Sequence, residues 1–381
     1  MGIAHAKLSA SGSHRWLNCP GSVAAEDSAG ARASSPFAEE GSCAHELADL
    51  VLSQGGTAFD WVGRQLIEYN QHTVEHEMAA YVQEYVDYVA SLGGVQEYEQ
   101  RVDFSDWVPG GFGTSDAIVT NDDTLYCVDL KYGKGVRVDA DENTQGMLYA
   151  LGALSERDMF EDFSRVVIVI HQPRLDHISE WETTPAAIYE WAEWVRERAA
   201  MALSADAPRN PGEKQCRFCA AKATCPALFR HTQETLMVDF DSFDGDTPST
   251  DALTDAQLRQ VLDNKKLIQT FLDAVEVHVH ERLASGKTFP GYKMVAGRSV
   301  RRWKDAEAAA EALQARLGDE AYQRKLLSVA QAEKALGKAN AKELSDLIEK
   351  PEGQPALAPE SDKRKEIKVG CQPDDFDEVV K

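Results

Sequence analysis

Apolar and polar residues alternate along this chain with two different periods, which predict an ordered series of helices and strands. Apolar side chains recur at helical spacing over 41–53 and 74–92, whereas residues 95–104 alternate as a strand does. Two further strands are predicted at 113–119 and 124–132, joined by the turn-forming residues TNDDT. The first part of the chain is therefore predicted to run helix, helix and three strands.

The pattern continues with a helix at 143–155, a continuous apolar strand in RVVIVIHQPR, and a tryptophan- and alanine-rich helix at 185–203. Tight turns join the first strands, so we predict an α/β fold with a mixed sheet flanked by helices rather than a doubly wound one.

Polar stretches divide the chain into parts. Residues 205–215 form a linker that leads into a cluster of cysteines, and a second polar stretch lies within 236–252. We predict that the latter separates a folded unit, 1–235, from a mainly helical region at 253–350 that contains a basic hairpin. The Pro-rich and charged residues 351–381 are predicted to form a flexible tail.

The formal net charge of -23 argues at first against a nucleic-acid partner, because phosphate binding depends on Lys and Arg. The charge is uneven, however. Residues 287–304 carry six cations and no acid, and they include Arg298, Arg301 and Arg302. This segment could bind DNA locally, although a solvated basic hairpin explains it equally well. No apolar run approaches the ~20 residues that span a bilayer, and no signal-peptide core is visible, so we expect a cytoplasmic protein without a membrane partner.

Four of the seven cysteines form a suggestive pattern, with Cys216, Cys219 and Cys225 close together and Cys19 far upstream. Cysteines stay reduced in the cytoplasm, which favours metal binding over disulfides. Zinc and an iron–sulfur cluster both fit the CRFC motif, although a zinc ribbon more often has two closely spaced pairs. Cys127 lies in an apolar strand and is predicted to be a small buried hydrophobe.

Acidic residues and a lysine mark the predicted strand pair. Asp129 and Lys131 are two residues apart, so they would share one face, and the partner strand carries Asp116. Two carboxylates suit Mg²⁺ or Mn²⁺, and an adjacent lysine could orient or deprotonate an attacking water. For these residues alone, an exposed hairpin with ordinary surface charges is the simpler alternative.

Three other residues could join this group. His45 lies on a predicted helix and could supply a neutral imidazole ligand. Gln145 and Tyr149 are spaced i and i+4, so they lie on one helix face and could contact a phosphate or a base edge.

The order of these motifs carries a resemblance. GSCAHELADLVL, GFGTSDAIV, YCVDLKYGKG and NTQGMLYALG together resemble the RecB-type branch of the PD-(D/E)xK nuclease superfamily. The resemblance implies a restriction-endonuclease-like core in which Lys131 is catalytic. It also implies roles in DNA contact and site support for Gln145 and Tyr149. The implied metal ligands are His45, Asp116, Asp129 and the Leu130 carbonyl. One departure is that Ser115 precedes Asp116, where the superfamily has proline.

The cysteine pattern, one distant Cys followed by Cys-x2-Cys-x5-Cys, resembles the iron-staple nucleases: the AddB nuclease domain and the CRISPR-associated RecB-like exonucleases. That resemblance implies a [4Fe–4S] cluster held by Cys19, Cys216, Cys219 and Cys225. The remainder of the chain resembles a phage and prophage family of otherwise unknown function.

These features together predict a Mg²⁺- or Mn²⁺-dependent DNA exonuclease that acts on single strands or duplex ends. Phage recombination or DNA end processing in the bacterial cytoplasm is the expected setting, with a phage annealing or single-strand-binding protein as a candidate partner. Two alternatives stay open: a catalytically inactive iron–sulfur module for DNA binding or assembly, and a redox sensor.

Overall fold

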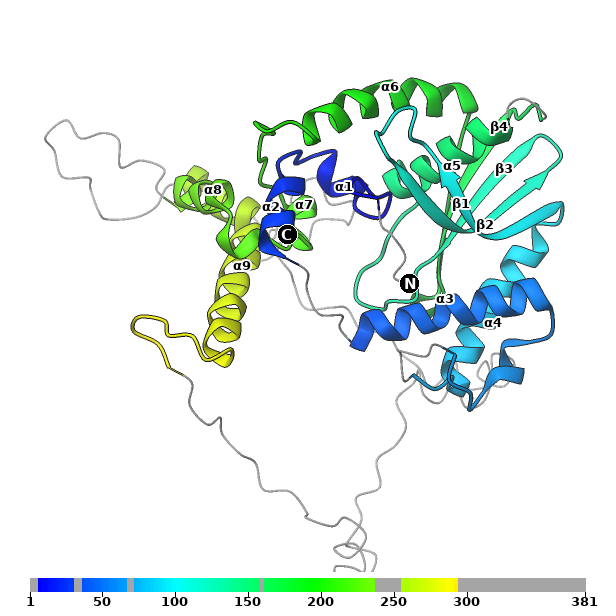
Figure 1. Ribbon diagram of the computed structural model, residues 1–381, viewed down its shortest axis with the longest axis horizontal. Helices are drawn as coiled ribbons and strands as arrows, with labels where there is room; N and C mark the ends of the chain where they lie inside the picture. The colour runs from blue at the N-terminus through cyan, green and yellow to red at the C-terminus, as the bar shows by residue number, and fades with distance from the viewer. Residues whose placement is uncertain (1–5, 31–35, 67–71, 158–160, 237–254, 294–381) are drawn as a thin grey trace, which may run out of the picture. The chain divides into compact units, whose positions relative to one another are not determined.

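The computed structural model describes residues 6–30, 36–66, 72–157, 161–236 and 255–293 (Figure 1). The chain divides into two compact units, Met1–Val295 and Ala296–Lys381. The second unit lies outside the described residues, and so do the predicted flexible tail and the three arginines of the basic hairpin, Arg298, Arg301 and Arg302.

Five strands form one mixed sheet in the order β1-β2-β3-β4-β5. All neighbouring strands are antiparallel except β3 and β4, which are parallel. A parallel pair needs a crossover connection, and helix α5 (Thr144–Arg157) supplies it. The predicted mixed α/β fold is therefore confirmed. The strands are β1 Val95–Asp103, β2 Phe112–Asn121, β3 Thr124–Leu130, β4 Arg165–Gln172 and β5 His177–Thr183.

Helices cover both faces of the sheet. Helices α3 (Pro36–Gln54) and α4 (His76–Ser91) lie on one face, and α5 and α6 (Pro185–Ala202) lie on the other (Figure 1). Strand β3 supplies both cores: Leu125 and Cys127 pack on the α5 side, and Val128 and Leu130 pack on the α3–α4 side. Cys127 is 2% exposed, as expected for a small buried hydrophobe.

The segments outside this three-layer core are short, apart from one long helix. That helix, α9 (Asp255–Ala284), packs Leu267 and Phe271 with Cys216 and Leu228. Part of the region predicted to follow the linker therefore contacts the cysteine segment. None of the described helices is both long and apolar enough to cross a membrane. The remaining elements are α1 Ser13–Trp16, α2 Ser22–Ala29, η1 Ala58–Trp61, η2 Pro173–Leu175, α7 Glu213–Arg217, η3 Lys222–Thr224, α8 Pro226–Leu236 and α9 Asp255–Ala284.

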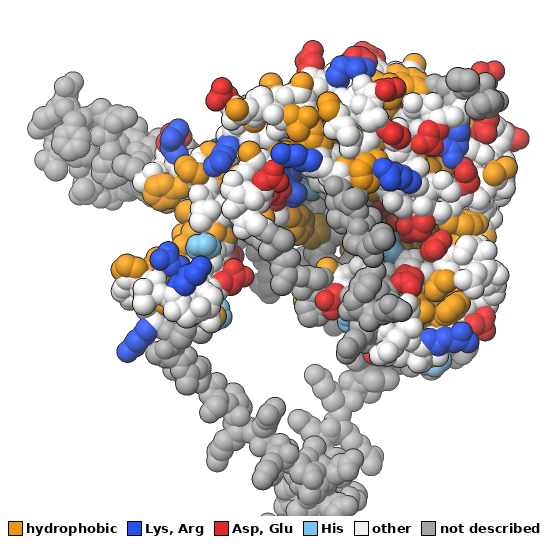
Figure 2. All heavy atoms as spheres, in the orientation of Figure 1, with side chains coloured by type: hydrophobic (Ala, Val, Ile, Leu, Met, Phe, Trp, Pro, Cys, Tyr) orange, Lys and Arg blue, Asp and Glu red, His pale blue; other side chains and the backbone are white. Residues whose placement is uncertain are grey.

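The surface mixes charges of both signs. On the face drawn in Figure 2, acidic and basic side chains are interspersed over the described part of the chain. The negative net charge is therefore not concentrated at one place on this face.

One buried histidine makes the stability of the sheet depend on pH. His171 on β4 is 3% exposed, and its ring centroid lies 5.6 Å from that of Tyr85 and 5.3 Å from that of Tyr88. Burial lowers the pKa of His171 to about 4. Because an unfolded histidine titrates near 6.5, the neutral ring stabilises the fold fully above that pH. This stabilisation, about 3 kcal/mol, is lost as the pH falls towards 4.

We therefore expect His171→Phe to retain the ring contacts and to reduce the loss of stability between pH 7 and pH 4.5. Urea unfolding midpoints at the two pH values measure this loss. His76→Gln, at an exposed position on α4, is the control. Equal losses in the wild type and in His171→Phe would contradict the assignment.

Candidate functional site

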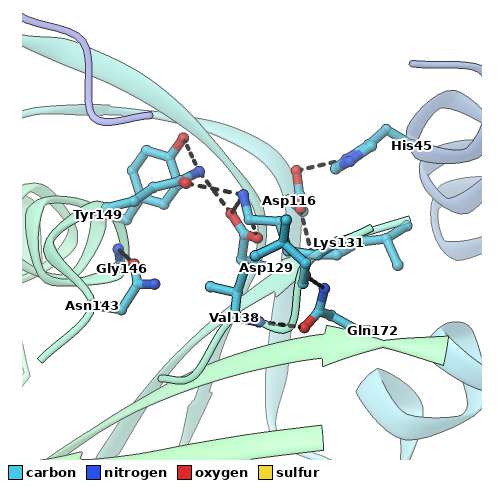
Figure 3. Close-up of polar contacts among 12 residues, drawn as sticks. His45, Asp116, Asp129, Lys131, Val138, Asn143, Gly146, Tyr149 and Gln172 are labelled. Atoms are coloured by element: carbon cyan, nitrogen blue, oxygen red, sulfur yellow. Dashed lines mark hydrogen bonds and ion pairs between the residues drawn. The ribbon is translucent and has the colours of Figure 1, made fainter. Parts of the chain in front are cut away.

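The six site residues predicted from the motifs come together at one end of the sheet (Figure 3). They form two adjoining hydrogen-bonded groups that are linked by strand β3. One group includes a residue from α3, on one side of the sheet, and the other includes two residues from α5, on the opposite side. The six are His45, Asp116, Asp129, Lys131, Gln145 and Tyr149.

The first group is centred on Asp116 of β2. Its Oδ1 lies 3.1 Å from Nδ1 of His45, and its Oδ2 accepts a 2.7 Å hydrogen bond from the backbone N–H of Leu130. Burial disfavours charge on His45, but the Asp116 carboxylate outweighs it and raises the pKa of His45 to about 9. Burial favours the neutral form of Asp116, but the imidazolium of His45 outweighs burial and holds the pKa of Asp116 below its ordinary value. The two side chains are therefore a charged pair in this structure.

The second group is centred on Asp129, which is 4% exposed at the end of β3. As the strand period predicts, Lys131 lies on the same face, and its Nζ is 2.8 Å from Oδ2 and 3.2 Å from Oδ1 of Asp129. Burial raises the pKa of Asp129, while the ammonium of Lys131 opposes that rise. Burial alone would lower the pKa of Lys131, but the Asp129 carboxylate raises it above its usual value, so the ammonium form is present at neutral pH.

Gln145 bridges these two charges. Its Oε1 accepts a 2.9 Å hydrogen bond from Lys131 Nζ, and its Nε2 donates to Asp129 Oδ1 at 2.7 Å. Nε2 also lies 3.2 Å from the hydroxyl of Tyr149, to which it donates. Tyr149 is only 7% exposed, so in this structure its ring supports Gln145 from the core side.

Two glycines permit this arrangement. A Cβ at Gly113 would lie 2.6 Å from Cε1 of Tyr149, which explains a glycine shortly before Asp116. A Cβ at Gly146 would lie 2.4 Å from Cγ2 of Ile168, so this glycine lets α5 approach β4 closely.

One further residue, Glu99, belongs to the site and is absent from the set predicted by sequence motifs. The carboxylate oxygen of Glu99 lies within 4.8 Å of ligand atoms of both His45 and Asp116. Pairs Tyr98–Ala117 and Gln100–Ser115 flank it, so Glu99 faces Asp116 across the two strands. The predicted strand 95–104 contained Glu99, and the pairing register of β1 with β2 is the signal that would have identified it.

The donor set fits a divalent cation on the His45 side of the site. An imidazole nitrogen and two carboxylates suit Mn²⁺, and carboxylates also suit Mg²⁺. Within the described residues, the only histidine, cysteine or acidic group with three ligand atoms mutually within 4.8 Å is His45, Glu99 and Asp116. Asp129 is not part of this group, and its carboxylate contacts Lys131 and Gln145.

The four cysteines of the predicted cluster line one cavity beside α2, α7 and η3. The backbone N–H of Asn210 donates to Cys19 Sγ at 3.2 Å, and that of Gly212 donates to Cys216 Sγ at 3.4 Å. The linker lies beside the Cys19 segment, and the backbone N–H of Gly21 donates a 2.8 Å hydrogen bond to the carbonyl oxygen of Pro208. This close approach requires glycine, because a Cβ on Gly21 would lie 2.5 Å from the carbonyl oxygen of Ala207.

These sulfurs share a cavity without forming a tight ligand group. Among the described residues, no three cysteine sulfurs lie mutually within 4.8 Å. A tetrahedral zinc ion with Zn–S bonds near 2.3 Å would bring its thiolates to about 3.8 Å from one another. Burial raises the pKa of Cys19 and Cys216, and it raises that of Cys219 to about 11, so these thiols are neutral in this structure.

The fold and the site define an α/β protein with a histidine–carboxylate–lysine centre and a separate cavity lined by cysteines. The chain belongs to a family described as a protein of unknown function, DUF2800, whose model matches residues 5–365. Among solved structures, the crystal structure of SSO0001 is similar with 16% sequence identity, over 57% of this chain and 85% of that chain, and with a TM-score of 0.27. At that TM-score the likeness supports no inference about fold or activity.

The close contact at Gly146 leads to a prediction about stability. Gly146→Ala gains up to about 1 kcal/mol of helix propensity but forces α5 away from Ile168, which costs about 1–3 kcal/mol. We therefore expect a net loss of about 1–2 kcal/mol, measured by urea unfolding.

The control for this prediction is Gly41→Ala in α3, where a Cβ would meet nothing within 4 Å. This variant should be as stable as the wild type or up to about 1 kcal/mol more stable. A Gly146→Ala protein as stable as Gly41→Ala would contradict the packing argument.

Proposed function

We propose that this protein is a metal-dependent deoxyribonuclease of the RecB-type PD-(D/E)xK class, acting as an exonuclease. The observation that carries the proposal is the contact of Lys131 Nζ with Asp129 and Gln145, beside the Asp116–His45 pair. These residues come from four separate elements, and a surface hairpin with ordinary charges would not bury an aspartate beside a half-buried lysine.

The contacts of each residue suggest a different role for it in the proposed reaction. Lys131, held as an ammonium by Asp129, carries a fixed positive charge that can stabilise charge developing on a phosphate. Gln145 holds the Lys131 ammonium and the Asp129 carboxylate in one orientation, and Tyr149 holds Gln145. Such positioning before the substrate arrives lowers the reorganisation needed in the transition state.

Divalent metal is the proposed cofactor. His45, Asp116, Asp129 and the Leu130 carbonyl are the proposed ligands of Mg²⁺ or Mn²⁺. When bound, the ion neutralises phosphate charge and lowers the pKa of an attacking water. Asp116 is suited to a ligand role because its two oxygens face His45 and the Leu130 backbone at the end of the strand pair.

We further propose that Cys19, Cys216, Cys219 and Cys225 hold a [4Fe–4S] cluster. Support comes from the shared cavity and from the N–H groups of Asn210 and Gly212 that donate to sulfur, a feature that tunes iron–sulfur clusters. Zinc is the alternative.

The proposed substrate is single-stranded DNA or a duplex end, and the proposed setting is phage recombination or end processing in the bacterial cytoplasm. A phage annealing or single-strand-binding protein is the proposed partner. Where Lys and Arg contact phosphate, DNA affinity is expected to fall as the salt concentration rises.

Nuclease activity is tested with end-labelled single- and double-stranded DNA, anaerobically purified protein and Mg²⁺ or Mn²⁺. We expect metal-dependent cleavage that falls by at least about 10²-fold in Lys131→Ala and in Asp116→Asn, because the first removes a positive charge beside the phosphate and the second removes a ligand of the proposed ion. Asp116→Asn is informative because it leaves the Asp129–Lys131 pair intact, and the product ladder gives the polarity.

Lys134→Ala is the matched control, since Lys134 is exposed in the loop after β3. It should cleave as the wild type does. Absence of cleavage on every substrate by protein with all its metals bound would favour the catalytically inactive binding module.

The cluster is tested by metal and sulfide analysis of anaerobically purified protein. We expect about four irons and four acid-labile sulfides per chain in the wild type, and their loss in Cys19→Ser and Cys216→Ser. Cys43→Ala, at a buried cysteine packed with α3 and α4, should retain both. One zinc and no sulfide per chain would rule out the cluster in favour of zinc.

A further inference from the structure

We propose that Glu99 is an additional protein ligand of the divalent cation, on the same side of the site as His45 and Asp116. This assignment rests on the proposed function for the use of the metal, but it can be measured without DNA. It adds a residue from β1 to a site that the sequence motifs assign to α3, β2 and β3.

The distances allow one ion to reach all three side chains. Their ligand atoms lie within 4.8 Å of one another. An ion with metal–ligand bonds of about 2.1 Å spans atoms up to about 4.2 Å apart, so small side-chain rotations suffice. The carboxylate of Glu99 is on the exposed side of the group, where a hydrated ion and a phosphate can enter.

The charges also call for a cation at this position. Glu99 faces Asp116 across β1 and β2, and like charges directly opposite one another on two strands are destabilising. In the part of the chain that the structure describes, neither carboxylate pairs with a lysine or an arginine at ion-pair distance. Nδ1 of His45 lies 3.1 Å from Asp116 Oδ1, and His45 would coordinate the ion as a neutral imidazole.

Asp129 provides the contrast within the same site. Its charge is already matched by the Lys131 ammonium at 2.8 Å, and Gln145 donates to it as well. The excess negative charge of the site is therefore on the Glu99–Asp116 side, and a divalent ion is the natural counter-charge there.

The test is a Mn²⁺ titration of the full-length protein without DNA, in which electron paramagnetic resonance reports free Mn²⁺. Glu99→Gln should raise the Kd for Mn²⁺ by tenfold or more. Asp122→Asn is the matched control, because it removes the same charge from the exposed β2–β3 turn at another residue with positive φ. This control should bind Mn²⁺ with wild-type affinity.

Thermal unfolding separates a ligand from a merely structural residue. Without metal, Glu99→Gln should have a Tm equal to or above that of the wild type, because a repulsion between carboxylates is removed. With Mn²⁺, the rise in Tm seen for the wild type should be largely lost. Glu99→Asn, whose side chain tolerates the left-handed backbone of φ 45° at this position, should behave in the same way if Glu99→Gln does not fold.

A Kd for Mn²⁺ within twofold of wild type in a folded Glu99 variant would overturn the assignment, and so would a wild type that binds no Mn²⁺. The first result, together with DNA cleavage by the wild type, would leave the nuclease proposal standing. Binding of Mn²⁺ that depends on Glu99, together with no cleavage of any DNA, would support this assignment and reject the nuclease.

Discussion

The contact between Lys131 and Asp129 is the interaction on which the rest of the site depends. A buried carboxylate is strongly destabilising unless a cation and hydrogen-bond donors accompany it. The ammonium meets the first need, and the side-chain amide of Gln145 meets the second. Helix α5 must therefore approach the end of β3 closely. The small residue Gly146 permits this approach. Because β3 and β4 are parallel, a crossover must connect them, and α5 is that crossover.

The two halves of the site differ in how their charge is balanced. On the α5 side, the buried Asp129 carboxylate and the partly exposed Lys131 ammonium neutralise each other. On the α3 side, Asp116 and Glu99 share a single imidazolium, so negative charge is left over at the exposed edge. Pairs of carboxylates held in different environments are typical of sites that assign separate roles to similar groups. The arrangement gives Asp129 a fixed place and leaves the Asp116 side able to respond to a cation.

Sequence reasoning reached most of this fold because its strongest patterns come from burial on both faces of the sheet. The continuously apolar sequence of β4 predicts that strand. The edge strand β5 is missing from the predicted elements. Its exposed residues Ile178, Glu180 and Glu182 alternate with half-buried ones, and only a short 3-10 turn separates it from β4. The six residues that the motifs single out lie close together in the structure. Glu99 belongs to no motif, and only the cross-strand register places it opposite Asp116. The relative positions of the cysteine sulfurs depend on packing between distant segments, which spacing along the chain does not specify.

The hydrogen-bonded contact between the segment around Cys19 and the linker, called the clasp below, affects the order in which the protein can fold during synthesis. Asn210 donates from its side chain to the Asn18 carbonyl, and Gly21 donates to Pro208, so both ends of the sheet-containing core meet at one place. The first half of this clasp leaves the ribosome long before the second. Its closure must wait until every strand has been made, which makes it a long-range contact that forms late. Any metal centre completed there would report that the whole sheet-containing core has been assembled.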